Sequence, residues 1–153
     1  MMESQNNYSS NKVQKFVLAL IPLFLIAFIL FFKSSIFEST LKLKNLGNLS
    51  MDPAIAFTNS KPTYLEFYAE WCEICKEMAP EVTELIKDFD NEINFVFLNV
   101  DNPKWEKFIK QFKVNGIPQI NFIDSNSNLK ATFVGLQEEK TLKDSINDLL
   151  NRV

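Results

Sequence analysis

Residues 65–76 have the sequence Leu-Glu-Phe-Tyr-Ala-Glu-Trp-Cys-Glu-Ile-Cys-Lys. The stretch before the first cysteine, residues 64–68, is apolar and aromatic apart from Glu66, which favours a β-strand. Apolar residues after the second cysteine recur with a helical period, which predicts a helix over residues 76–90. Cys72 therefore lies where a strand gives way to a helix, and the positive end of the helix dipole stabilises a thiolate there.

The spacing of the two cysteines suggests their chemistry. Two intervening residues let the sulfur of Cys75, one helical turn on, reach back to Cys72 and close a small disulfide. Cys72 would then be the attacking thiolate and Cys75 the resolving thiol. Half of a zinc site and two ordinary buried cysteines have the same spacing, so the motif alone leaves three interpretations open.

Composition removes several other chemistries. The chain of 153 residues has no histidine, and Cys72 and Cys75 are its two cysteines. Without histidine there is no Ser-His-Asp or Cys-His pair, no histidine-ligated zinc and no Cys-x-x-Cys-His haem attachment. Two thiolates cannot complete a four-cysteine metal site. The remaining candidates are thiols, carboxylates, lysines and aromatic side chains.

The rest of the globular part alternates helices with strands. Asp52-Pro53 is a helix-start signal, an N-cap followed by proline, and it predicts a short helix over residues 51–59. The other predicted helices lie near residues 105–112 and 142–150, and the other predicted strands are residues 93–100, 119–123 and 131–134. This α-β-α-β-α-β-β-α order predicts an α/β fold with a mixed central sheet flanked by helices.

The N-terminal third has a different composition. Residues 1–15 are polar and predict a disordered tail. Residues 16–32 carry no charge, and 17 helical residues rise about 25 Å, which is enough to cross a membrane at the short end of the range. A cleaved secretory signal is the alternative, but the run is longer than is usual for one and is followed by no convincing cleavage site. We expect a transmembrane anchor at 16–32, a linker at 33–50 and the globular domain at 51–153.

Charge is distributed unevenly between these parts. Residues 1–50 hold five lysines against two glutamates, whereas residues 51–153 hold 11 basic against 17 acidic residues. The acidic domain makes nucleic-acid binding unfavourable, because a phosphate backbone would be repelled. Lysines lie on both sides of residues 16–32, so the positive-inside rule does not choose an orientation.

Several motifs occur together in the order and spacing of one known family. The Trp-Cys-x-x-Cys-Lys stretch is followed by Ala79-Pro80, then by Leu-Asn-Val-Asp at residues 98–101, then by Gly-Ile-Pro at residues 116–118. Over residues 51–153 the chain resembles the thioredoxin family. The resemblance implies a thioredoxin-like fold and a redox-active disulfide between Cys72 and Cys75, with no metal and no cofactor.

The resemblance also implies roles for residues outside the cysteine motif. Pro118 matches the family's cis-proline, which lies opposite the cysteines and keeps them from binding metal. The backbone of Ile117 would pair with an extended substrate segment. Trp71 would form part of the active-site rim, and Gly135 would lie beside the partner groove. A plain turn proline, a packing tryptophan and a turn glycine are the alternatives for Pro118, Trp71 and Gly135.

Glu66 matches the buried acidic position of thioredoxins. A carboxyl group in an apolar strand should have a raised pKa, and its carboxylate can accept the proton of Cys75 during resolution of the mixed disulfide. The alternative is a strand residue that faces water. Phe97 occupies the position of the lysine that pairs with this acid in typical thioredoxins, so a charge that would keep Glu66 ionised is missing.

Other features resemble a membrane-anchored group within the family. The Trp-Cys-Glu-x-Cys form, the N-terminal apolar run and residues 99–105 are similar to the TxlA-type proteins of cyanobacteria and plastid thylakoids. That similarity implies a monomer with its domain on the lumenal or periplasmic side. It also implies a membrane thiol carrier of the CcdA or DsbD kind upstream, and disulfide-containing clients such as apocytochromes downstream.

The sequence therefore predicts a membrane-anchored thiol–disulfide oxidoreductase. Glu70, Glu73 and Glu77 lie near Cys72 in the sequence and only Lys76 opposes them, so the thiolate of the reduced form should be disfavoured. A less stable reduced form favours a reductant over an oxidant. The alternative function is a non-catalytic binding or assembly factor that uses the groove near Pro118 without turnover.

Overall fold

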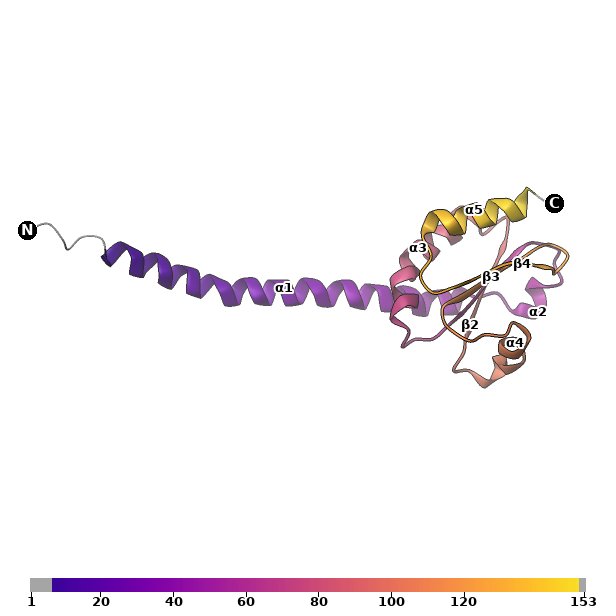
Figure 1. Ribbon diagram of the computed structural model, residues 1–153, viewed down its shortest axis with the longest axis horizontal. Helices are drawn as coiled ribbons and strands as arrows, with labels where there is room; N and C mark the ends of the chain where they lie inside the picture. Colours follow the sequence, from indigo (N-terminus) through magenta and orange to yellow (C-terminus); the bar gives the residue numbers. More distant parts are fainter. Residues whose placement is uncertain (1–6, 152–153) are drawn as a thin grey trace, which may run out of the picture. The chain divides into compact units, whose positions relative to one another are not determined.

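The computed structural model describes the backbone of residues 7–151, and their side chains except those of residues 7–17, 19 and 32–36. Figure 1 shows the order of the elements along the chain. The helices are α1 (Asn7–Leu49), α2 (Pro53–Ala56), α3 (Glu73–Phe89), the 3₁₀ helix η1 (Pro103–Trp105), α4 (Glu106–Gln111) and α5 (Glu139–Leu150). The strands are β1 (Thr63–Tyr68), β2 (Asn94–Asn99), β3 (Gln119–Ile123) and β4 (Leu129–Val134).

The four strands form one mixed sheet, as the sequence predicted, and their order in it is β2-β1-β3-β4. β1 and β2 are parallel, because α3 carries the chain back across the sheet between them. β3 runs antiparallel to both β1 and β4, and the polar turn at residues 124–128 joins it to β4. Every residue of β1 is buried, so this central strand is covered on both faces.

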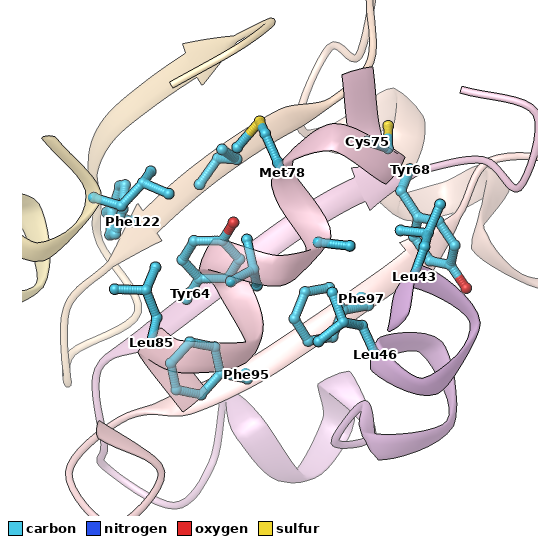
Figure 2. Close-up of a cluster of buried hydrophobic side chains, with 14 of the residues drawn as sticks. Leu43, Leu46, Tyr64, Tyr68, Cys75, Met78, Leu85, Phe95, Phe97 and Phe122 are labelled. Carbon is cyan, nitrogen blue, oxygen red and sulfur yellow. The ribbon is translucent and has the colours of Figure 1, made fainter. Parts of the chain in front are cut away.

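Each face of the sheet has its own hydrophobic core. One cluster contains Tyr64 and Tyr68 from β1 together with Cys75 of α3, residues of α5 and the end of α1 (Figure 2). The other contains Leu65 and Phe67 of β1 and is covered by α2, η1 and α4. Because side chains alternate along a strand, Glu66 belongs to the same face as Tyr64 and Tyr68. The cysteines therefore lie over the face of β1 to which Glu66 points.

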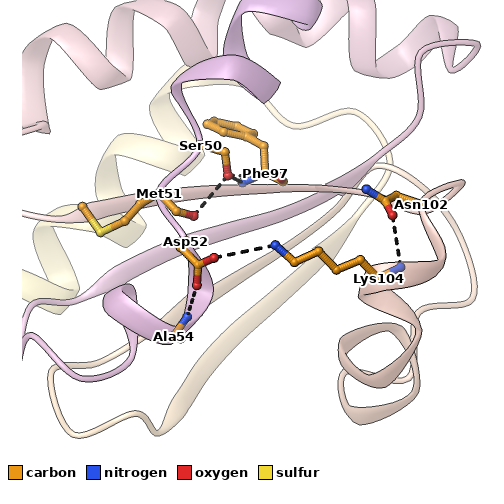
Figure 3. A network of polar contacts seen from close by, with 7 residues as sticks. All are labelled: Ser50, Met51, Asp52, Ala54, Phe97, Asn102 and Lys104. Atoms are coloured by element: carbon orange, nitrogen blue, oxygen red, sulfur yellow. Dashed lines mark hydrogen bonds and ion pairs between the residues drawn. The ribbon is translucent and has the colours of Figure 1, made fainter.

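The helix-start signal at Asp52-Pro53 is confirmed, although α2 is shorter than the helix predicted over residues 51–59. The carboxylate of Asp52 accepts a hydrogen bond from the backbone N–H of Ala54 at 2.8 Å, and Pro53 opens α2 (Figure 3). The helix predicted over residues 76–90 begins earlier, at Glu73, with Cys72 as its N-cap. The predicted strand at residues 119–123 has the same bounds as β3.

The N-terminal third differs from the prediction. α1 begins at Asn7 and ends at Leu49, so it occupies most of the segment expected as a tail and a linker. Residues 1–6 of the expected tail lie outside the described residues. Two compact units divide after Glu38, and the second begins at Ser39 rather than at residue 51. The sequence boundary therefore lies inside the compact unit.

The last turns of α1 pack into the core of the second unit. Leu43 and Leu46 are each 1% exposed and belong to the cluster that contains the cysteines. A methyl group on Gly47 would collide with the hydroxyl group of Tyr68, so the helix approaches β1 closely at this point. Residues 43–47 are thus part of the domain.

Beyond α1, the chain pairs with the edge of the sheet. The hydroxyl of Ser50 donates to the carbonyl of Phe97 at 3.1 Å and accepts from its N–H at 2.8 Å (Figure 3). The N–H of Met51 donates to the carbonyl of Phe95 at 3.0 Å. These bonds cover part of the outer edge of β2.

The expected transmembrane anchor at residues 16–32 is only partly described, because the side chains of residues 16, 17, 19 and 32 lie outside the description. Among the described residues, no helix has the combination of length and hydropathy needed to cross a membrane.

Candidate active site

The two cysteines form a disulfide at the start of α3. Cys72 and Cys75 are joined with their Cα atoms 5.3 Å apart. The sulfur of Cys72 accepts a hydrogen bond from the backbone N–H of Cys75 at 3.1 Å, so it already lies where the free N–H groups of the helix end stabilise negative charge. Cys72 is 6% exposed and Cys75 is 1% exposed, which makes Cys72 the more accessible of the two to another protein.

Glu66 is buried in the middle of the sheet. It is 1% exposed and does not face water. Burial raises the pKa of its carboxyl group to about 7, while the hydrogen bond that its carboxylate accepts from the hydroxyl of Tyr64, at 2.7 Å, acts to lower that pKa. The raised pKa agrees with the expectation from sequence. A group with this pKa can both accept and release a proton near neutral pH.

The neighbours of Glu66 in the sheet are apolar. Phe97 of β2 is its Cα partner on one side and Ile120 of β3 on the other. Phe97 therefore lies beside Glu66, at the position where the family resemblance implies a lysine in typical members. The described side chains offer Glu66 no cation in that position, and Tyr64 is its hydrogen-bond partner instead.

Pro118 and Gly135 lie next to each other. The Ile117–Pro118 peptide bond is cis. The N–H of Gly135 donates to the carbonyl of Pro118 at 2.9 Å, which joins the start of β3 to the end of β4. Gly135 has a φ of 85°, a conformation that favours glycine. Ile117 is half-buried and packs against the cluster that contains both cysteines.

Trp71 lies at the surface next to the disulfide. Its side chain is 63% exposed, and its indole N–H donates to the carboxylate of Asp101 at 2.8 Å. The backbone N–H of Asp101 in turn donates to the side-chain carbonyl of Asn99 at 2.9 Å. The loop after β2 thus fixes the orientation of the tryptophan, which supports a place on the active-site rim.

The charged residues near Cys72 in the sequence are mostly acidic and exposed. Glu70, Glu73 and Glu77 all face solvent. Lys76, the cation nearest to Cys72 in the sequence, forms an ion pair with Glu73, one of the three carboxylates, at 2.7 Å. Exposure weakens each of these effects on the sulfur, because water and salt screen surface charges.

Two residues of the site were not predicted from the sequence. Tyr64 lies two positions before Glu66 in the same strand, and this spacing places both side chains on one face of the sheet. Asp101 belongs to the Leu-Asn-Val-Asp motif and lies two residues after β2, a strand that runs parallel to β1. Either position could have been found by asking which polar groups share an edge or a face with a site residue.

Comparison with known proteins agrees with the fold and the motif. Residues 49–148 match the protein family described as Thioredoxin. The chain is 39% identical over 124 residues to the thioredoxin-like protein HCF164, chloroplastic, of Arabidopsis thaliana, covering 81% of this chain and 48% of that protein. It is 39% identical over 97 residues to the thiol:disulfide interchange protein TxlA homolog of Synechocystis, covering 63% of this chain and 54% of that protein.

A solved thioredoxin structure has a similar fold. The germline-specific thioredoxin Deadhead of Drosophila melanogaster superimposes with a TM-score of 0.53 and 31% identity, covering 60% of this chain and 83% of that one. By contrast, the chain spans about half the length of these curated relatives.

Proposed function

This chain belongs to the thioredoxin family, and we propose that it is a thiol–disulfide oxidoreductase that reduces disulfides in other proteins. The observation that carries the proposal is the Cys72–Cys75 disulfide at the start of α3, with the Cys72 sulfur hydrogen-bonded to a backbone N–H. Reduction of a disulfide substrate such as insulin by the purified chain tests it.

The proposed reaction uses the two cysteines in turn. In the reduced protein, the Cys72 thiolate attacks one sulfur of the client disulfide, a mixed disulfide forms, and the other client sulfur leaves as a thiolate. Cys75 then passes its proton to the Glu66 carboxylate and attacks the Cys72 sulfur. The second client sulfur leaves, and the pair ends as the disulfide seen in the structure. The client gains the two electrons that the cysteines lose.

The surface beside the cysteines would hold the client. We assign the backbone of Ile117, together with Gly135 and the exposed ring of Trp71, to substrate binding. Three observations support this: the cis peptide at Pro118, its hydrogen bond with Gly135, and the 63% exposure of Trp71. An extended client segment can pair with backbone groups that an irregular strand end leaves open.

We further propose that the protein works as a reductant. Strong oxidants of this kind owe their potential to a stabilised thiolate in the reduced form. Here Glu70, Glu73 and Glu77 lie within five residues of Cys72 in the sequence, and Lys76 is ion-paired with Glu73. The negative surroundings disfavour the thiolate and leave the pair reducing.

The reduction potential tests this direction of electron flow. We expect a redox titration against glutathione or dithiothreitol to give a value nearer the ~−270 mV of reducing thioredoxins than the ~−120 mV of strong oxidants. The Glu73→Gln variant should shift the potential toward the oxidising end, since it removes one negative charge. A wild-type potential near −120 mV contradicts the assignment as reductant.

We also propose that residues 16–32 anchor the protein in a membrane, with the domain on the lumenal or periplasmic side. Support comes from the uncharged run itself and from α1, where large apolar side chains such as Leu23, Phe24 and Phe31 are more than half exposed. The similarity to a chloroplastic relative and to TxlA favours a thylakoid or bacterial plasma membrane. A membrane thiol carrier of the CcdA or DsbD kind would then supply electrons, and apocytochromes are candidate clients.

Labelling of the cysteines tests the anchor and its orientation together. We expect the chain to stay with membranes after alkaline extraction. After mild reduction of vesicles whose cytoplasmic face is outward, a membrane-impermeant maleimide should label Cys72 only once the membranes are permeabilised. Labelling of the intact vesicles would assign the domain to the cytoplasmic side. Release of the chain by alkaline extraction would contradict the anchor.

A non-catalytic assembly factor is the alternative function. The exposed apolar side chains of Trp71, Ile74, Val134 and Leu136 would suit a binding surface that needs no turnover. The disulfide at the helix start favours the catalytic function, because binding alone requires no thiol pair.

A further inference from the structure

We propose that Tyr64 is a positioning residue for Glu66. In place of a charged partner, its hydroxyl group stabilises the ionised Glu66 carboxylate, which is the form that can take the proton of Cys75. The inference rests on the proposed thiol–disulfide exchange and deepens it by assigning control of the proton-transfer step. Nothing in the cysteine motif itself points to this residue.

The geometry that carries the inference is a buried hydrogen bond within one strand. The Tyr64 hydroxyl donates to a carboxylate oxygen of Glu66 at 2.7 Å, and the two residues are 0% and 1% exposed. Residues two apart on a strand share a face, so the pair needs no long-range contact to meet. A hydrogen bond to a charged group is stronger in such a dry environment than at the surface.

Aromatic packing fixes the tyrosine ring. Its centroid lies 5.4 Å from that of Phe95, 6.0 Å from that of Phe97 and 5.6 Å from that of Phe122. Figure 2 shows these rings around Tyr64, in the same cluster as Cys75. A ring held on several sides has little freedom to turn its hydroxyl group away from Glu66.

Among the described groups near Glu66, Tyr64 supplies the hydrogen bond to its carboxylate. Its sheet neighbours, Phe97 of β2 and Ile120 of β3, are apolar. α3 contributes Cys75, and β1 contributes Tyr64 and Tyr68 as its other titratable groups on this face. In the described part of the chain, Tyr64 is the hydrogen-bond donor to Glu66, and no lysine or arginine pairs with it.

The sign of the effect on catalysis follows from the protonation states. Glu66 can accept a proton only when it is ionised, so the resolving step should accelerate as the pH rises through its pKa of about 7. The Tyr64 hydroxyl stabilises the ionised form and opposes the raising effect of burial. Without it, the pKa of Glu66 should rise further and the acceleration should begin at higher pH.

The resolving step can be measured directly with dithiobis(nitrobenzoic acid). Cys72 of the reduced protein attacks the reagent and releases one thionitrobenzoate. Cys75 then attacks the mixed disulfide and releases a second in an intramolecular phase. For Tyr64→Phe we expect the pH midpoint of this second phase to rise by about one pH unit or more, which makes the phase about fivefold slower at pH 7 and restores it at high pH.

Matched variants separate this role from general damage to the core. Tyr68→Phe removes another phenol hydroxyl from the same face of β1 and should leave the midpoint in place. Glu66→Gln should remove the titration near pH 7, and adding Tyr64→Phe to it should change the profile no further. Should Tyr64→Phe fold poorly, 3-fluorotyrosine at position 64 keeps the shape and donates more strongly, so the midpoint should fall.

A carboxyl-carbon NMR titration of Glu66 gives a readout that does not depend on activity. A midpoint that is the same in the wild type, Tyr64→Phe and the fluorotyrosine protein overturns the assignment of Tyr64. If instead the wild type shows no Cys72-dependent reduction while the Glu66 titration moves as expected, the oxidoreductase function fails and the Tyr64–Glu66 coupling stands. The two failures are therefore distinguishable.

Discussion

The Cys72→Ser variant should lose disulfide reduction altogether, with insulin turnover lower by roughly a thousandfold or more. Cys72 supplies the sulfur that forms the mixed disulfide, and a serine hydroxyl at this position cannot undergo thiol–disulfide exchange. The variant should remain folded, because the side chain is small and its backbone remains the N-cap of α3. The measurement is insulin precipitation with dithiothreitol as the electron source.

The Cys75→Ser variant is the matched control for that experiment. It keeps the attacking thiol but lacks the resolving one, so it should form mixed disulfides that accumulate and can be released by reductant. Partners trapped in this way identify the clients, and apocytochromes are expected among them. Unchanged insulin reduction by Cys72→Ser rejects the mechanism, and a wild-type protein that reduces nothing while still binding its clients favours the assembly factor.

The Leu46→Ala variant should lower the free energy of unfolding of the domain by about 2–5 kcal/mol. Leu46 is 1% exposed and lies in the cluster that also contains the cysteines, so its removal leaves a cavity in the main core. Chemical denaturation of the full chain in detergent, followed by the change in tryptophan fluorescence, measures the effect. The result would place the end of α1 inside the cooperative unit of the domain.

Leu49→Ala is the control on the same helix. Leu49 lies one turn after Leu46 but is 67% exposed, so its truncation should change stability by no more than about 0.5 kcal/mol. Equal effects of the two substitutions would mean that the burial of Leu46 does not account for the loss of stability. An unaffected Leu46→Ala variant would return the domain boundary to residue 51.

The parts of the fold predicted well from sequence are those with a strong local signal. β3 alternates polar and apolar residues between a proline and a polar turn, and its bounds were predicted correctly. The end of α1 was predicted as a linker because its two buried leucines, Leu43 and Leu46, are separated by two polar residues and give too short a pattern to indicate a buried helix. Their burial comes from contact with β1, which no local pattern encodes.

The site shows the same division. Cys72 and Pro118 were predicted from motifs, and the structure places one at the start of α3 and the other in a cis peptide bond. Burial of Glu66 was also predicted. Its hydrogen bond with Tyr64 was not, because the family pattern directs attention across the sheet to Phe97 and away from the strand itself.

The pairing of Ser50 and Met51 with β2 has a consequence for handling the protein. An uncovered edge strand is a template for aggregation, since its free N–H and carbonyl groups can pair with another chain. β2 is an outer strand, and the bonds from these two residues occupy part of its free side. A truncated chain that begins at residue 51 would lose the Ser50 bonds together with the leucines of α1. The edge of β2 and the apolar surface under those leucines would then be exposed, which favours self-association. Soluble fragments are better begun before Ser39.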